Sequence, residues 1–411
     1  MKILVLSHRI PFPPNKGEKI RTFHQIQFLA SRGHEILVLS PFEEQEELAF
    51  AKELERSLGE RGLNVKALMF PLKAKWLRLA KGLATNQSLT VANFHNQSMQ
   101  DAFDDLIDAG DCHAVICTSS AMSSFVFQNT ALMNASNKPL IRLVMDFMDL
   151  DSDKWAQYES KAKLPMRLVY GREKKLVNVV EKRSYQRFDE CFFISENEVN
   201  LFAGQLAESS KLKVLGNGID GAMFFPSKQG ERPGQPVFLF TGVMNYKPNE
   251  DAVQWFVDAV WADVKAAWPQ AEFVIAGMDP TPKIQQLAKN PGITVTGFVD
   301  DIVPYYQKAD VFVAPFRLAR GVQNKILQAL ACGLPVVTTQ LGLEGIKAEP
   351  EQDILVANNP ESFFEAIQRL LTEEPLYRRL SENGPKFIQQ HHSWDSVLQG
   401  LAAVLEGEER S

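Results

Sequence analysis

Two series of short apolar runs, each alternating with helical segments, follow one another along the chain, and residues 215–236 separate them. In the first series, apolar strands are expected at residues 2–6 and 35–40, with a helix over residues 19–31 between them. Strand, helix, strand is a βαβ unit, and its repetition builds a parallel sheet with helices on its faces. Residues 215–236 are rich in Gly and Pro and have no periodicity, which is typical of a linker. The sequence therefore predicts two doubly wound, Rossmann-like α/β domains.

A chain of 411 residues is too long for a single hydrophobic core, which agrees with this division. Further strands are expected at residues 65–70, 114–118, 140–145, 191–195, 237–241, 272–276, 293–296, 311–314 and 335–339. The predicted domains are residues 1–214 and 237–386, with residues 215–236 as the linker. Residues 387–411 are expected to form a C-terminal helix that packs back on the first domain.

Composition excludes several classes of protein. The net charge of −6 and the pI near 5.8 argue against a nucleic-acid-binding protein. The four cysteines are too scattered for a disulfide framework or a zinc site, so buried, reduced thiols are expected. The N-terminal apolar run is too short for a signal peptide, and no run is long enough to span a membrane. We therefore expect a cytoplasmic protein, either free or peripheral on the inner face of the cytoplasmic membrane.

The most informative stretch is PFRLARGVQNKILQALACGLPVVTT, residues 315–339. A glycine before a helix N-terminus, here Gly321, lets backbone amides approach a diphosphate, whose charge the helix dipole favours. Lys325, one turn further on, can add a positive charge to the same phosphates. The alternative is a packed helix that leads into a strand, with no ligand.

This stretch resembles glycosyltransferase family 4, in which a Gly and a Lys precede a helix that reads E-A-(M/L)-A-x-G-x-P-V-V. The resemblance implies a GT-B fold, in which two Rossmann-like domains face a central cleft, and a nucleotide-sugar donor. The chain departs from the family at Gln328 and Arg320, where family members usually have Glu. The resemblance implies that Gln328 bonds the ribose hydroxyls.

Three predicted strands of the second domain end in glycine, at Gly242, Gly277 and Gly297. In a parallel sheet these ends meet at one edge, where ligands bind, although such glycines also serve packing. Lys247 is expected beside the same cleft. By the resemblance, Phe298 and Val299 bracket the nucleotide base, and Arg317 is the candidate for a second phosphate contact.

The first domain offers a second set of candidates. Residues 13–21, which include Gly17, resemble the loop of the family that covers the donor phosphates. The run from Asp146 to Trp155 follows another strand and resembles the branch of sugar transferases associated with bacterial exopolysaccharide and PEP-CTERM loci. Asp146 and Asp149 are expected near the reacting sugar.

The aspartates of this run also satisfy D-x-D, a metal-binding pattern, because hard divalent cations prefer carboxylates. Helix capping and turn formation are the alternative. Since Lys325 and helix dipoles can hold the diphosphate, we expect no metal and no cofactor beyond the donor substrate.

Residues 61–100 contain basic but no acidic side chains. Apolar residues at helical spacing lie among them, which indicates an amphipathic helix on anionic lipid, with a solvated basic face as the alternative. The expected contacts with such a membrane are Lys73, Lys75, Trp76, Arg78 and Lys81.

Together these features predict a metal-independent hexosyltransferase-type enzyme that moves a sugar to a lipid-linked or saccharide acceptor in polysaccharide or glycoconjugate synthesis. Retention of configuration is implied by the resemblance. Lys325, Arg317, Asp146 and Asp149 are the expected catalytic residues. Two alternatives stay open, namely a GT-B-shaped sugar-nucleotide epimerase and a non-catalytic scaffold in a polysaccharide assembly complex.

Overall fold

The computed structural model describes residues 1–134, 140–226, 235–318 and 321–407. The chain divides into two compact units. Unit 1 comprises Met1–Asn217 together with the last residues from Leu398, and unit 2 comprises Gly218–Val397. Each unit has its own parallel sheet and its own hydrophobic core.

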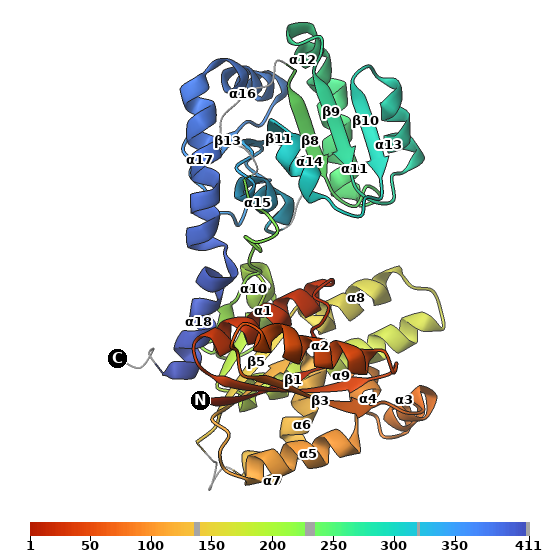
Figure 1. Cartoon of the computed structure of the whole chain (residues 1–411). Coiled ribbons are helices and arrows are strands. Elements are labelled where there is room, and N and C mark those ends of the chain that lie inside the picture. The colour runs from red at the N-terminus through yellow and green to blue at the C-terminus, as the bar shows by residue number, and fades with distance from the viewer. Residues whose placement is uncertain (135–139, 227–234, 319–320, 408–411) are drawn as a thin grey trace. The chain divides into compact units, whose positions relative to one another are not determined.

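Unit 1 is built on a sheet with the strand order β3-β2-β1-β4-β5-β6-β7. Its strands are β1 (Lys2–Ser7), β2 (Glu35–Phe42), β3 (Val65–Pro71), β4 (Ala114–Thr118), β5 (Arg142–Met148), β6 (Glu190–Phe193) and β7 (Leu212–Val214). Its helices are α1 (Gly17–Ser31), α2 (Glu47–Gly59), α3 (Lys75–Ala84), α4 (Leu89–Phe94), α5 (Gln97–Asp108), α6 (Ser123–Gln128), α7 (Thr130–Met133), α8 (Asp151–Lys161), α9 (Met166–Arg187) and α10 (Glu196–Ala203). In Figure 1, α1 and α2 lie on one face of this sheet, and α5 and α6 lie on the other.

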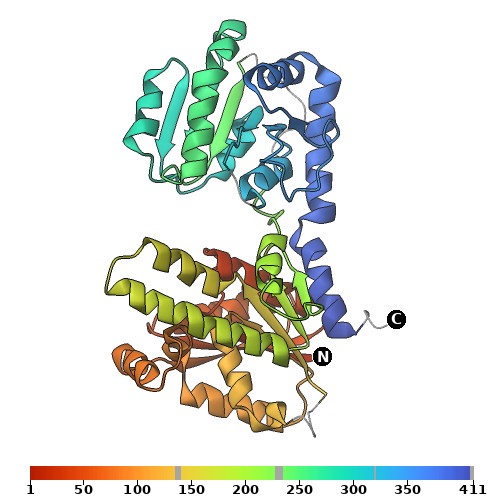
Figure 2. The same cartoon turned by 180° about the vertical axis from the view of Figure 1, so that it is seen from behind.

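Unit 2 repeats this plan, with the strand order β10-β9-β8-β11-β12-β13. Its strands are β8 (Val237–Thr241), β9 (Glu272–Ala276), β10 (Ile293–Gly297), β11 (Val311–Ala314), β12 (Val336–Thr338) and β13 (Leu355–Val356). Its helices are α11 (Lys247–Ala259), α12 (Trp261–Ala267), α13 (Pro282–Gln286), α14 (Val303–Lys308), α15 (Asn324–Ala331), α16 (Pro360–Thr372) and α17 (Glu374–His391), and α18 (Trp394–Glu406) continues into unit 1. Figure 2 shows the two units from behind.

The predicted class of fold is confirmed, because the strand pairings of the described residues are parallel and helices connect most of the strands. In both sheets the third, second, first and fourth strands lie side by side in that order. The strand order therefore reverses beside β1 in unit 1 and beside β8 in unit 2. Ligands of doubly wound sheets bind at such points, outside the carboxyl ends of the strands.

The sequence pattern missed two short strands and two helix breaks. β7 and β13 have only three and two residues, which is too short to show a periodicity. Residues 249–267 belong to two helices, α11 and α12, which Val260 separates because its φ of −128° is not helical. The C-terminal helix expected from residue 387 is instead the end of α17 followed by α18.

The last helix belongs to unit 1 from Leu398 onward. Within that unit, Glu406 of α18 accepts hydrogen bonds from Arg32 and lies 3.0 Å from Nε2 of His34. All four cysteines are buried and free, as expected. Among the described residues, no helix is both long and apolar enough to cross a membrane.

Candidate functional site

A cavity of about 710 Å³ lies at the carboxyl edge of the unit 2 sheet. It is lined by the ends of β8 and β9, the residues after β10, and the first turn of α15. The lining residues are Thr241, Gly242, Val243, Asn245, Tyr246, Asn249, Ala276, Gly277, Met278, Phe298, Val299, Ile302, Asn324, Lys325 and Gln328. Among the described residues that form this lining, Lys325 is the one ionisable cation and there is no carboxylate. The cavity therefore suits an anionic ligand.

Two glycines shape the floor of this cavity. Gly242 and Gly277 have φ angles of +152° and +142°, which side chains of L-residues rarely adopt. A Cβ on Gly277 would lie 1.8 Å from the carbonyl oxygen of Gly242. A Cβ on Gly242 would lie 2.7 Å from Nζ of Lys325 and 2.6 Å from Nδ2 of Asn249. Any side chain at these two positions would push apart the two strand ends and Lys325. Both positions thus require glycine.

Lys325 lies in the first turn of α15 and has no ion pair among the described residues. Its ammonium group donates to Oδ1 of Asn249 at 2.5 Å and lies 4.7 Å and 5.3 Å from the ring centroids of Phe240 and Phe316. Asn249 is itself held, because its Nδ2 donates to the carbonyl of Val243 at 2.9 Å. Burial lowers the pKa of Lys325 to about 7. An anion bound in the cavity would act as the counter-ion of this ammonium group.

Gln328 lies one turn after Lys325 on α15, and its carbonyl oxygen is already engaged. The hydroxyl of Tyr306, a buried residue of α14, donates to Oε1 of Gln328 at 3.0 Å. The same hydroxyl lies 2.6 Å from Oγ1 of Thr241 at the end of β8. This chain of hydrogen bonds connects three elements behind the cavity and fixes the side chain of Gln328.

The structure brings together six of the candidates of unit 2: Gly242, Gly277, Phe298, Val299, Lys325 and Gln328 all line the cavity. Phe298 is 66% exposed, so its ring is accessible to a ligand. The other candidates, Arg317, Lys247 and Gly321, do not belong to the lining. Arg317 forms a two-point ion pair with Asp251 at 2.7 and 3.1 Å, and Lys247 lies 3.6 Å from Glu250. Arg320 lies outside the described residues.

In unit 1 the structure places Asp146 inside the core, where its side chain is 1% exposed. Arg21 of α1 donates to both of its carboxylate oxygens, at 2.7 and 2.9 Å, and Gln25 donates to Oδ2 at 2.6 Å. Arg21 also donates to the carbonyl of Gly216. The buried carboxylate of Asp146 therefore joins β5 to α1, and Arg21 joins α1 to the last residues of unit 1, since a buried charge needs such partners.

The aspartates that follow Asp146 pair with a lysine. Nζ of Lys154 lies 2.6 Å from Asp149 and 3.6 Å from Asp151. Asp151 and Asp153 occupy the first turn of α8, where the helix dipole favours negative charge. Among the described residues, no group of three His, Cys, Asp or Glu side chains is arranged to hold a metal ion. Gly17, the first residue of α1, is exposed and has open space around it.

Only part of the basic segment around α3 is free to contact a partner. Trp76 is 83% exposed, and Lys73 and Lys81 are exposed too, whereas the exposed Lys75 lies with its Nζ 3.9 Å from the carboxylate of Glu43. Arg78 differs from our expectation, because it turns inward. Its guanidinium group donates to the carbonyl of Asn93 and pairs with Glu43 at 3.2 Å, which leaves its side chain 12% exposed.

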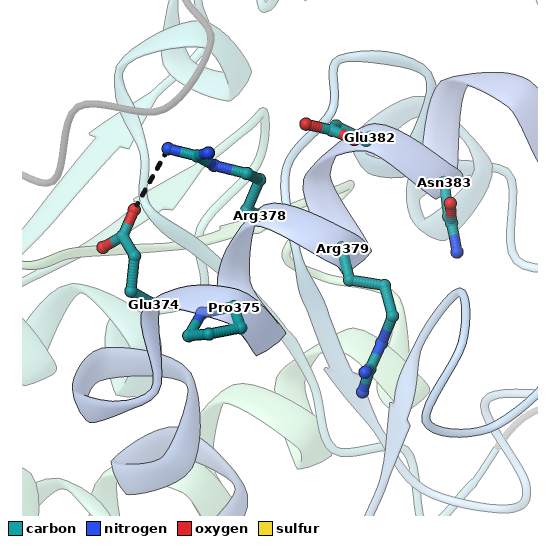
Figure 3. Close-up of a pocket in the computed structure, with 6 residues that line it drawn as sticks. All are labelled: Glu374, Pro375, Arg378, Arg379, Glu382 and Asn383. Atoms are coloured by element: carbon teal, nitrogen blue, oxygen red, sulfur yellow. Dashed lines mark ion pairs between the residues drawn. The ribbon is translucent and has the colours of Figure 1, made fainter.

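A second hollow, of about 400 Å³, lies along α17. Figure 3 shows its lining, which comes from a single helix: Glu374, Pro375, Arg378, Arg379, Glu382 and Asn383. Arg378 is paired with Glu374 there, and the side chains spread along the helix instead of converging. This hollow therefore lacks the convergent polar groups of a ligand site.

Asn249 and Tyr306 were not recognised as site residues from the sequence. Their partners, Lys325 and Gln328, are 76 and 22 residues away along the chain. The available signal was weak: both are polar residues on the buried side of helices, at positions that would otherwise suit an apolar side chain.

Comparison with known proteins shows what the chain is similar to. Residues 235–373 match the family described as glycosyl transferases group 1. A 44.6 kDa uncharacterized protein from the cps region of Klebsiella pneumoniae is 22% identical over 97% of this chain and 98% of its own length. The capsular polysaccharide biosynthesis glycosyltransferase CapM of Staphylococcus aureus is 26% identical over 29% of this chain and 31% of its own length.

Among solved structures, HepE of Anabaena in complex with UDP-glucose superimposes with a TM-score of 0.60. The alignment covers 99% of this chain and 100% of that one, at 14% identity. HepE has also been solved with UDP. The fold of the chain is therefore GT-B, with two parallel-sheet α/β domains, and the comparisons support a GT-B glycosyltransferase.

Proposed function

We propose that the protein transfers a sugar from a nucleotide-diphosphate sugar to an acceptor, and that the cavity of unit 2 binds the donor. The observation that supports this most is Lys325, an ammonium group for which the described residues provide no ion pair and whose described cavity lining contains no carboxylate. The cavity lies wholly within the segment that matches the glycosyl transferases group 1. HepE, which shares the fold, binds UDP and UDP-glucose.

The chemistry follows from the charge that develops when the bond between sugar and diphosphate breaks. A positive group positioned at the leaving oxygen stabilises that charge, and it is more effective in a partly buried site. Lys325 and the backbone amides at the start of α15 would supply this stabilisation. Arg317 could contribute only after leaving Asp251. Since these groups neutralise the diphosphate, we infer that no metal ion is needed.

Phe298 and Val299 would contact the base, and Gln328 would contact the ribose through its amide N–H₂. This arrangement suits the replacement of the usual Glu of family 4 by Gln328, because the amide of Gln donates a hydrogen bond where the carboxylate of Glu would accept one. We infer that the chain is nevertheless a member of that family, in the branch associated with exopolysaccharide and PEP-CTERM loci, and that it retains anomeric configuration. Asp149 is our candidate for a contact with the reacting sugar.

We further infer a lipid-linked or saccharide acceptor in polysaccharide or glycoconjugate synthesis. The name of CapM and the genomic region of the Klebsiella relative support this. The exposed Trp76 and lysines of α3 would place the enzyme on the inner face of the cytoplasmic membrane, where a lipid-linked acceptor is accessible.

The test is donor turnover. The protein is incubated with a panel of UDP-, GDP-, dTDP- and CDP-sugars, and release of the nucleoside diphosphate is measured with and without a membrane extract as acceptor source. Release from one donor supports the proposal. Conversion of a donor to its epimer without release would favour the epimerase, although no pair of acid and base side chains lines the cavity. Neither release nor conversion from any donor would favour a scaffold.

A further inference from the structure

The connection between α8 and α9 has an unusual surface, since every residue from Lys163 to Leu168 is exposed. Three of these residues are large and apolar: Leu164 is 71% exposed, Met166 44% and Leu168 69%. We call residues 163–168 the hairpin tip. Single exposed apolar side chains are ordinary, but a contiguous group of them marks an interaction site.

The hairpin behind this tip is well packed. The rings of Trp155, Tyr158 and Tyr170 contact one another, with centroids 5.6–5.9 Å apart. Lys174 of α9 pairs with Glu159 of α8 at 3.3 Å. The tip is thus presented on two helices that pack against each other, and its apolar side chains are left without partners in the fold.

Charge around the tip is of one sign. Lys163, Arg167 and Lys175 are exposed and form no ion pair among the described residues. No acidic residue occurs between Ser160 and Arg172. An apolar tip framed by free cations is complementary to a surface that is negative outside and apolar beneath, which is the structure of an anionic membrane.

The tip and α3 are connected. Arg172 of α9 donates to the carbonyls of Gly82 in α3 and Gln87 just after it, at 3.3 and 2.9 Å. Trp76 and Leu77 of α3 are 83% and 71% exposed. In Figure 2, the bend between the olive helices α8 and α9 lies at the same end of unit 1 as the orange helix α3. The hairpin tip and α3 are therefore neighbouring elements, and each has exposed apolar side chains with lysines beside them.

We propose that the hairpin tip and α3 form one composite surface that docks on an anionic membrane, with Leu164, Met166 and Leu168 inserted among the lipid headgroups. This proposal rests on the proposed function. It adds to it an apolar membrane anchor that α3 alone would not provide. The lysines of both elements attract the membrane, and the tip holds the protein there once it has arrived.

The experiment is co-sedimentation of the full chain with vesicles of phosphatidylglycerol and phosphatidylcholine, at low and high salt. The wild type is expected to pellet with phosphatidylglycerol at low salt and less at high salt. L164S/L168S is expected to bind these vesicles at least about tenfold more weakly, because two apolar anchors are lost. The matched control V179S/L201S changes two other exposed apolar residues of unit 1, 62% and 43% exposed, and should bind like the wild type.

Calorimetric titration with UDP separates this proposal from the proposed function. L164S/L168S should bind UDP like the wild type, since the tip belongs to unit 1 and the cavity to unit 2. A wild type that stays in the supernatant at low salt, or an L164S/L168S variant that pellets as well as the wild type, overturns the docking surface, and the tip would then serve a protein partner. Vesicle binding that depends on the tip, in a protein that binds none of UDP, GDP, dTDP and CDP, would uphold the surface and refute the proposed function.

Discussion

The hydroxyl of Tyr306 lies 3.0 Å from Oε1 of Gln328 and 2.6 Å from Oγ1 of Thr241. A tyrosine hydroxyl has a single proton, so when it donates to Gln328 it must accept from Thr241. The carbonyl of Gln328 then accepts one hydrogen bond, which fixes the orientation of the amide and leaves its N–H₂ free of that contact. A side chain buried behind the cavity thus holds the orientation of the amide that lines it.

Tyr306→Phe is therefore expected to weaken UDP binding about three- to tenfold, because one neutral hydrogen bond is worth roughly 0.5–1.5 kcal/mol. The measurement is calorimetric titration of the wild type, Tyr306→Phe, Gln328→Ala and the double variant. If Tyr306 acts by positioning Gln328, substitution of Tyr306 causes no further loss of UDP affinity in the Gln328→Ala background. Equal losses in both backgrounds would show that the hydroxyl has only a structural role.

Binding of a nucleotide diphosphate should take up a proton at alkaline pH. Burial lowers the pKa of Lys325 to about 7, and bound phosphates would raise it again. Below pH 7 the ammonium group is already charged, so little uptake is expected there. Above pH 7 the affinity should fall as pH rises. Titrations at pH 8 in two buffers of different ionisation enthalpy measure this uptake. Identical apparent enthalpies would contradict it.

Gly277→Ala should destabilise the protein and abolish UDP binding. The new Cβ would lie 1.8 Å from the carbonyl oxygen of Gly242, so the ends of β8 and β9 must separate. We expect a loss of roughly 1–3 kcal/mol in the free energy of unfolding, as in other overpacked sites. Gly221→Ala is the control, because nothing lies within 4 Å of its Cβ position. Urea unfolding curves that coincide for Gly277→Ala and the wild type would be inconsistent with this close approach.

The βαβ pattern was sufficient to predict the two sheets apart from β7 and β13, because the other strands are short apolar runs with turn residues beside them. The pattern also predicted that Gly242, Gly277 and Lys325 lie at one edge of the sheet, since strand ends and helix starts of a parallel sheet share that edge. Long-range pairing was not predictable. Arg78 was expected on the surface, but Glu43, which lies 35 residues earlier, helps to turn it inward.

Asp146 illustrates the same limit. Its place at the end of a strand suggested a reactive carboxylate, and only the structure reveals Arg21 and Gln25 opposite it, more than 120 residues away in sequence. The βαβ pattern of the sequence predicts at which edge of the sheet a residue lies. Whether its side chain is free or already paired depends on partners that the pattern does not identify.

Turnover of the donor should persist in excess EDTA. The positive charge that the diphosphate requires would come from Lys325 and from backbone amides at the start of α15, which chelation does not remove. The assay is release of nucleoside diphosphate before and after EDTA treatment. Complete loss of release, restored by magnesium or manganese, would instead make carboxylates such as Asp149 and Asp151 candidate metal ligands.

The central claim is that Lys325 binds the donor diphosphate, and calorimetric titration of UDP into wild type and Lys325→Ala at pH 6.5 tests it most directly. Lys289→Ala, which removes an exposed lysine of the same unit, is the control. A charge-assisted hydrogen bond is worth roughly 1.5–3 kcal/mol, so the dissociation constant of Lys325→Ala should rise about 10- to 150-fold. The control should keep the wild-type value. A Lys325→Ala variant that is folded and binds UDP as tightly as the wild type would contradict the account.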